Sequence, residues 1–209
     1  MVTATGDRKL PPVVTNNVLR YLLSPPERLV KRYVSSGERA ADLGCGAGFH
    51  SLAMARIVGE SGRVFAVDFD PAVIARLQRR AERRRCQRII TARATSASEI
   101  DFIDDGSIDF VLAEGLLCCM SDHAGAIRQI QRILHPRGRA YLSTVKLMRP
   151  DDPRTVTREE WEHLLSSFRL LDRGEALMSR WALVGPREGG APAVGAFRAR
   201  LGARGPCCC

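Results

Sequence analysis

From Arg39 onwards, the chain alternates between two spacings of apolar residues. Five short apolar runs have the length and side-chain character of buried strands: 39–43, 63–68, 88–93, 108–113 and 139–145. Three segments between them carry apolar residues at helical spacing: 49–58, 71–85 and 124–134. This alternation predicts an α/β fold, doubly wound around a mostly parallel and buried sheet.

Capping and turn residues mark the ends of several predicted elements. Asp70 followed by Pro71 is typical of a helix N-cap and first turn. Thr157 and Glu160 form a capping-box pattern before another helix. The segments 168–174 and 179–185 then indicate two strands, which a short turn would pair in antiparallel fashion. The segment 135–138, His-Pro-Arg-Gly, is expected to end the helix over 124–134.

The chain is expected to hold one domain with two extensions. Residues 1–37 are predicted to form a tail and a short helical cap, with helices split at Ser24-Pro25-Pro26. Residues 38–186 form the main domain. Residues 187–209 are rich in Gly, Pro, Ala and Arg and have no periodicity, so a flexible tail is expected there.

Composition excludes several classes of protein. A chain of 209 residues, 45% hydrophobic and 26% charged, is ordinary for a globular domain. No apolar run is long enough to span a membrane, and the first residues show no secretory signal, so a cytoplasmic location is expected. The seven cysteines are odd in number and form no C-x-x-C pair. We therefore expect reduced thiols and no metal site.

The segment 41–48, Ala-Asp-Leu-Gly-Cys-Gly-Ala-Gly, is the most informative stretch. Three glycines lie between a strand and a helix, where backbone N–H groups can approach a ligand closely. The spacing fits neither the dinucleotide fingerprint G-x-G-x-x-G nor a Walker loop, which needs a lysine. A second acid, Asp68, closes the next strand and could accept hydrogen bonds from both ribose hydroxyls.

Three blocks in this order resemble a class I S-adenosylmethionine-dependent methyltransferase. They are the glycine loop, the segment 62–71 (GRVFAVDFDP) and the segment 132–143 (RILHPRGRAYLS). The resemblance is strongest to small-molecule enzymes of the ubiquinone and menaquinone type and covers roughly residues 25–185. It implies a Rossmann-like sheet of seven strands, the last of them antiparallel.

The resemblance also implies roles for individual residues. Asp42 and the loop residues Gly44, Cys45, Gly46 and Gly48 would hold the methionine end of S-adenosylmethionine. Asp68 would bind the ribose and Phe69 would pack on the adenine. The acid often found near the adenine amine is absent here, and the corresponding positions are Ser96 and Ala97.

Residues after the fourth strand are the candidates for proton transfer. The cofactor supplies the methyl group, so the protein supplies orientation and, for some acceptors, a base. Glu114 could orient the cofactor or take a proton, and His123 follows it in the same loop. His50 adjoins the glycine loop and is expected to face solvent. The predicted partner is a small organic methyl acceptor; the oligomeric state is not predicted.

Three other functions stay open. Arginine supplies 29 of the 32 basic residues and the net charge is +9, so an RNA methyltransferase is an alternative, although no aromatic residues are interleaved with the arginines. Cys45, Cys118 and Cys119 suggest an arsenite methyltransferase, but adjacent cysteines are expected to point apart. A non-catalytic partner protein with this fold is the third. The C-terminal Cys207–Cys209 has no assigned role.

Overall fold

The computed structural model describes residues 26–146, 149 and 151–187. The predicted first helix and the tail from 188 lie outside these residues. The elements are, in chain order, α3 (Pro26–Tyr33), β1 (Arg39–Leu43), α4 (Ser51–Val58), β2 (Arg63–Asp68), α5 (Pro71–Arg83), β3 (Ile90–Ala94), β4 (Ile108–Ala113), the 3-10 helix η1 (Leu117–Cys119), α6 (His123–Ile133), β5 (Leu134–Val145), α7 (Arg158–Leu165), β6 (Arg169–Glu175) and β7 (Ser179–Gly185).

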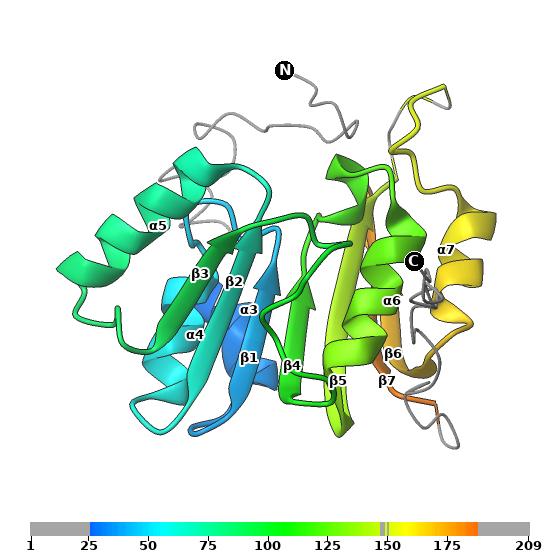
Figure 1. The fold of residues 1–209 in the computed structure, drawn as a ribbon. Helices are drawn as coiled ribbons and strands as arrows, with labels where there is room; N and C mark the ends of the chain where they lie inside the picture. The colour runs from blue at the N-terminus through cyan, green and yellow to red at the C-terminus, as the bar shows by residue number, and fades with distance from the viewer. Residues whose placement is uncertain (1–25, 147–148, 150, 188–209) are drawn as a thin grey trace, which may run out of the picture.

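One seven-stranded sheet organises the molecule, with strand order β3-β2-β1-β4-β5-β7-β6 (Figure 1). Strands β1 to β5 pair with one another in parallel, whereas β7 runs antiparallel to both β5 and β6. The order reverses between β1 and β4, which are adjacent in the sheet but separated by two strands along the chain. The α/β class and the mostly parallel seven-stranded sheet are confirmed.

Each face of the sheet carries its own hydrophobic core. Helices α3, α4 and α5 cover one face, where their apolar side chains pack on alternate residues of the central strands, such as Ala40 and Phe110. Helices α6 and α7 cover the other face and pack on Leu43 and Val111. Strand side chains alternate between faces, so a central strand must be apolar throughout, as the sequence pattern requires.

The predicted caps form as expected. The Asp70 carboxylate accepts a hydrogen bond of 2.9 Å from the Ala72 backbone N–H at the start of α5. The Thr157 hydroxyl accepts one of 3.1 Å from the Glu160 N–H at the start of α7. Each contact satisfies an N–H group that has no partner within the helix.

Strand β5 differs from its prediction. It begins at Leu134, directly after α6, so the segment 135–138 lies within the strand rather than in a separate turn. The pairing with β4 is irregular there, because Ile108 pairs with Leu134 while Phe110 pairs with Arg139. The extra residues of β5 interrupt the regular register at this point. Similarly, β3 is shifted to Ile90–Ala94 from the predicted 88–93.

Helix α3, which lies within the segment predicted to form the helical cap, is part of the helical layer on one face of the sheet. It packs against α4, and its Tyr33 ring stacks on Phe110 at a centroid distance of 5.9 Å. The Arg139 guanidinium reaches the Tyr33 carbonyl and ties the helix end to β5. The rest of the predicted cap lies outside the described residues.

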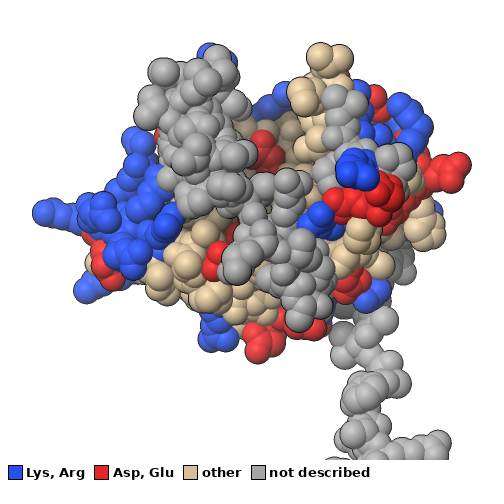
Figure 2. Space-filling model, turned by 90° about the horizontal axis from the view of Figure 1, so that it is seen from above, with Lys and Arg blue, Asp and Glu red and all other residues tan. Residues whose placement is uncertain are grey.

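Basic side chains gather over one side of the molecule. Figure 2 shows this group at the left, over α5. Six arginines on α5 and the turn after it are exposed: Arg76, Arg79, Arg83, Arg84, Arg85 and Arg88. In the part of the chain that the structure describes, no helix is long and apolar enough to cross a membrane.

Candidate functional site

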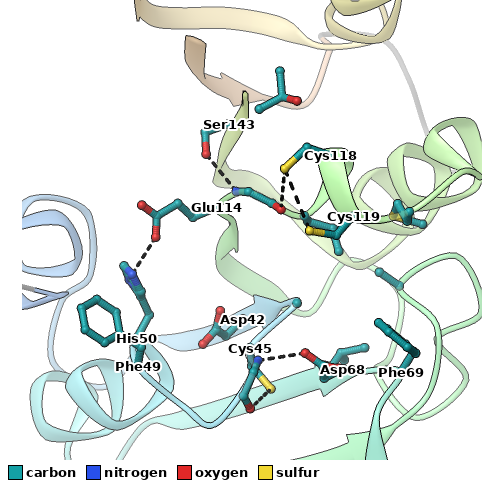
Figure 3. A pocket seen from close by; sticks show the side chains of 18 of the residues that line it. Asp42, Cys45, Phe49, His50, Asp68, Phe69, Glu114, Cys118, Cys119 and Ser143 are labelled. Carbon is teal, nitrogen blue, oxygen red and sulfur yellow. Dashed lines mark hydrogen bonds and ion pairs between the residues drawn. The ribbon is translucent and has the colours of Figure 1, made fainter. Parts of the chain in front are cut away.

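A cavity of about 380 Å³ opens at the carboxyl edge of the parallel strands. Its walls come from the loops after β1, β2, β3 and β4 and from the ends of β5 and β7. This is the point where the strand order reverses, and loops on either side diverge there and leave a crevice. Figure 3 shows the side chains that line it.

The glycine loop forms the floor of this cavity. Gly44, Gly46 and Gly48 all have positive φ, at 78°, 51° and 83°. The N–H groups of Gly44 and Cys45 donate to the Val67 carbonyl at 2.8 and 2.9 Å, so the loop folds over the end of β2. A Cβ on Gly48 would lie 2.3 Å from Leu77, whereas one on Gly46 would meet nothing within 4 Å. Gly48 therefore serves packing, and Gly46 leaves room for a ligand.

Asp68 holds the glycine loop in place. Its Oδ2 atom accepts a hydrogen bond of 2.9 Å from the Gly46 N–H, and its Oδ1 atom accepts one of 3.0 Å from the Asp70 N–H. The carboxylate lines the cavity at the end of β2, the position that the sequence predicted for it. Asp68 thus joins the loop after β1 to the loop after β2.

Asp42 is buried under the same loop. Its Oδ2 atom accepts a hydrogen bond of 2.5 Å from the Ser51 hydroxyl at the start of α4. The pKa of Asp42 is raised to about 7, mainly by burial; the Ser51 hydrogen bonds oppose this rise, and the charges of Glu114 and Asp68 add to it. This carboxyl group therefore changes charge near neutral pH.

His50 and Glu114 form an ion pair across the cavity (Figure 3), with 2.7 Å between Nε2 and Oε2. His50 was expected to face solvent, and that expectation is wrong: the side chain is only 8% exposed. It is the N-cap residue of α4, so the start of the helix turns it toward the cavity. The Gly115 N–H donates to the Ser143 hydroxyl at 3.0 Å, which fixes the backbone next to Glu114.

His123 is buried away from the cavity. Its Nε2 atom lies 2.9 Å from the Leu117 carbonyl, and its Nδ1 atom lies 2.6 Å from the Glu160 carboxylate. Both ring nitrogens are thus held by the protein, and His123 is not among the residues that line the cavity. Its predicted role as a base is corrected to a structural one, in which it links η1, α6 and α7.

Three thiols line the cavity, but they are not gathered at one point. The Cys45 thiol donates to the Gly46 carbonyl at 3.5 Å, whereas the Cys118 thiol donates to the Gly115 carbonyl at 3.2 Å. The Sγ atoms of Cys118 and Cys119 lie 4.0 Å apart, so these adjacent side chains do not point apart as expected. Among the described residues, no group of three or more His, Cys, Asp or Glu side chains could hold a metal ion.

The structure brings most of the predicted cofactor residues together. Nine of them line the one cavity: Asp42, Gly44, Cys45, Gly46, Asp68, Phe69, Ser96, Ala97 and Glu114. Gly48 is the exception, because it packs under Leu77. One wall of the cavity was not predicted from the sequence: there the rings of Tyr141 and Trp181 stack at a centroid distance of 5.6 Å. Trp181 comes from the antiparallel strand β7, so no motif next to the glycine loop could have indicated it.

This fold and this glycine-loop cavity define a class I S-adenosylmethionine-dependent methyltransferase domain. The chain belongs to the methyltransferase domain family, whose model matches residues 34–175. The chain is 27% identical over 138 residues to a demethylmenaquinone methyltransferase of Lactobacillus johnsonii, a match that covers 66% of this chain and 54% of that protein.

A second curated relative is a 2-phytyl-1,4-naphtoquinone methyltransferase of Synechococcus elongatus. It is 31% identical over 117 residues, which cover 56% of this chain and 49% of that protein. A third is an uncharacterized 37.1 kDa protein in a Streptomyces fradiae transposon, 33% identical over 49% of this chain and 29% of that protein. The chain thus spans about half or less of the length of these three relatives.

Solved structures share the fold at low sequence identity. A SAM dependent methyltransferase from Aquifex aeolicus superposes with a TM-score of 0.72 at 18% identity and covers 84% of this chain and 98% of its own. A geranyl diphosphate C-methyltransferase from Streptomyces coelicolor gives a TM-score of 0.67 at 14% identity. The match covers 88% of this chain and 89% of that chain.

The chemistry of the cavity fits S-adenosylmethionine, which carries a positive sulfonium and a positive ammonium group. The protein as a whole has a net charge of +9, yet four carboxyl groups line this cavity: Asp42, Asp68, Asp70 and Glu114. Opposite charges at short range stabilise one another in a partly buried site. The open space at Gly46 lets a ligand approach the loop backbone.

Proposed function

We propose that this protein transfers a methyl group from S-adenosylmethionine to a small organic acceptor. The observation that carries the proposal is the division of the cavity into two sides. One side combines the glycine loop with Asp42, Asp68 and Asp70, and the other joins Glu114 to an apolar and aromatic wall from β5, β7 and η1. A cavity of this size, largely apolar with a few polar groups, is typical of a small-molecule site.

The cofactor residues are assigned by their positions on the first side. Asp42 and the backbone of Gly44 to Gly46 would hold the methionine portion of the cofactor. Asp68 would accept hydrogen bonds from the ribose hydroxyls, while Phe69 would pack on the adenine. Ser96 and Ala97, which line the cavity after β3, would contact the adenine edge.

Glu114 is proposed as the group that takes a proton from the acceptor. The bound cofactor supplies an electrophilic methyl group, and an acceptor hydroxyl or carbon acid must lose a proton to become nucleophilic. Glu114 is 32% exposed on the cavity wall, and His50 fixes one of its oxygens at 2.7 Å. An anchored carboxylate keeps a defined direction toward the acceptor, which a mobile side chain would lose.

The second side of the cavity suits a flat, apolar acceptor. Tyr141 and Trp181 present stacked rings with an interplanar angle of 16°, and Leu116, Met120 and Val145 line the same cavity. Burial raises the pKa of the Tyr141 phenol, and the charge of Glu114 raises it further, so this hydroxyl stays protonated and can donate a hydrogen bond. The curated relatives with quinone names are consistent with such an acceptor.

The proposal is tested by calorimetric titration with S-adenosylmethionine and S-adenosylhomocysteine, followed by an acceptor screen. The wild type should bind both ligands, and aromatic hydroxyl compounds and quinols should give S-adenosylhomocysteine as product. Glu114→Gln should weaken cofactor binding only modestly, through the loss of one negative charge, and should lose turnover even at saturating cofactor. A well-folded wild type that binds neither ligand would overturn the assignment. Turnover unchanged in Glu114→Gln would overturn the role of this residue.

An RNA acceptor is the second candidate, because the six exposed arginines over α5 form a basic surface (Figure 2). Counter-ion release makes binding to a polyanion fall steeply with salt. Retention on heparin that collapses at moderate salt, together with co-purified RNA, would favour this candidate. Elution typical of a neutral surface would leave the small acceptor as the function.

A further inference from the structure

We propose that Cys118 and Cys119 form a dithiol site that captures a soft, trivalent, thiophilic ligand such as an arsenic(III) compound. The inference goes beyond the proposed function and does not depend on the identity of the methyl acceptor. It concerns two neighbouring thiols that the methyl-transfer proposal leaves without a role.

The geometry of η1 brings the two sulfur atoms together. The Cys119 N–H donates to the Leu116 carbonyl at 2.9 Å and closes the turn, and the Cys118 thiol lies 3.2 Å from the Gly115 carbonyl. These contacts hold the Sγ atoms 4.0 Å apart (Figure 3). The distance is close to van der Waals contact, so a small side-chain rotation allows both sulfurs to bind one atom.

Both cysteines line the cavity; Cys119 is partly exposed, whereas Cys118 is buried beside it. Cys118 and Cys119 line the cavity beside Gly115, at the end of β4, and neither is in a disulfide. Sulfur ligands are soft and select soft centres over hard ones. Because only two thiols converge, the site suits a ligand that needs two sulfurs, and it does not need the third thiol of the cavity.

Cys45 is the natural comparison within the same cavity. Burial raises the pKa of its thiol well above the usual value, and the charges of Asp42 and Asp68 raise it further. The thiolate is the form that binds soft metals, so Cys45 is poorly suited to capture them. Its thiol donates a hydrogen bond to the Gly46 carbonyl in the floor of the cavity and does not contribute to the pair formed by Cys118 and Cys119.

The capture reaction balances without any oxidant. With phenylarsine oxide, both thiols lose their protons, two arsenic–sulfur bonds form, and the arsenic–oxygen bond breaks. The oxygen leaves as water with the two protons, and neither arsenic nor sulfur changes its oxidation state.

The test uses phenylarsine oxide with the full chain, in which Cys207, Cys208 and Cys209 are first changed to serine because they also supply adjacent thiols. Mass spectrometry of this parent protein should show one adduct, formed with loss of water, that withstands glutathione and is removed by dithiothreitol. Either Cys118→Ser or Cys119→Ser should weaken capture at least about tenfold, since a single thiol cannot chelate. Cys45→Ser and Cys86→Ser serve as matched controls and should keep the adduct.

Two results would overturn the site: no chelated adduct on the parent protein, or an adduct that persists in both the Cys118→Ser and Cys119→Ser variants. Thermal unfolding and S-adenosylmethionine titration of each variant identify any that has failed to fold. Cys118→Ala and Cys119→Ala then replace such a variant. The same titration separates failure of this site from failure of the proposed function, because cofactor binding does not require the thiol pair.

Discussion

Ser51 donates a 2.5 Å hydrogen bond to the buried carboxyl group of Asp42, and this contact links the end of β1 to the start of α4. The bond lies under the glycine loop, beside the proposed methionine subsite. Burial nevertheless raises the pKa of Asp42 to about 7. Cofactor affinity and protein stability should therefore both depend on the charge of this one residue.

Cofactor affinity should rise with pH as Asp42 loses its proton. A cation binds best to the carboxylate form, so affinity should increase up to about tenfold per pH unit below the pKa and level off above it. Titration calorimetry of S-adenosylmethionine between pH 5.5 and 8.5 measures this. Asp42→Asn should bind weakly and lose most of the pH dependence. An equally steep profile in that variant would assign the effect to another group.

The same residue should make the unliganded protein less stable at high pH. A pKa that is raised in the folded state favours the protonated form, so the stability it contributes at low pH is lost as pH rises through about 7. Asp42→Asn has no charge to bury, so at pH 8.5 its free energy of unfolding should exceed that of the wild type by on the order of 2 kcal/mol or more. At pH 4 the two should be similar. Urea unfolding at pH 4 and pH 8.5 measures this difference in stability. The same difference at both pH values would contradict the prediction.

Substitution by alanine should have different effects at two glycines of the loop: mainly on stability at Gly48 and mainly on cofactor affinity at Gly46. Gly48→Ala places a Cβ 2.3 Å from Leu77 at a φ of 83°, so the free energy of unfolding should fall by about 2–5 kcal/mol. Gly46→Ala meets open space and should cost about 1–2 kcal/mol for its positive φ. Its larger effect should be on S-adenosylmethionine affinity. Urea unfolding measures the loss of stability and calorimetry measures the loss of cofactor affinity. Equal losses of stability in the two variants would refute the different roles of Gly46 and Gly48.

Replacing Asp68 should impair cofactor binding without unfolding the domain. Asp68→Ala removes the partner of the Gly46 N–H and the proposed ribose acceptor, so affinity should fall about 10–100-fold, as expected for hydrogen bonds to a charged group. Asp68→Asn keeps a side-chain oxygen, so its affinity for the cofactor should lie between those of the wild type and Asp68→Ala. Circular dichroism checks the fold. Wild-type affinity in Asp68→Ala would remove the ribose assignment.

His123 should affect stability rather than chemistry. His123→Ala leaves the buried Leu117 carbonyl without its side-chain partner and breaks the contact with Glu160, which should cost about 2–4 kcal/mol. His163→Ala, an exposed histidine on α7, is the matched control and should change little. Chemical unfolding measures both. If His123→Ala abolished turnover at unchanged stability, the structural role would be wrong.

The elements were predictable because their apolar spacing matches how they are buried. Strands β1, β2 and β4 begin and end at the predicted residues, since a central strand buried on both faces leaves a continuous apolar run. The start of β5 was not predictable in the same way. Pro136 and Gly138 indicated a turn, but pairing with β4 carries the strand through this segment with an irregular register.

That the residues proposed for the cofactor side would lie together was also predictable, because they follow the ends of adjacent strands directly. His50 was not, since only the orientation of α4 turns the side chain toward Glu114. The proximity of Cys118 and Cys119 depends on the backbone turn of η1, which residue type alone does not determine. The aromatic wall depends on β7 returning beside β5.

The residues that line the cavity fall into two continuous stretches of chain, 42–97 and 114–181. The first stretch holds the glycine loop and the proposed cofactor contacts, and the second holds Glu114, the thiols and the aromatic wall. A genetic crossover within the connection from β3 to β4 would therefore exchange one whole side of the cavity and preserve the other. We expect such a recombinant to keep the proposed cofactor side unchanged while it takes on a different acceptor side.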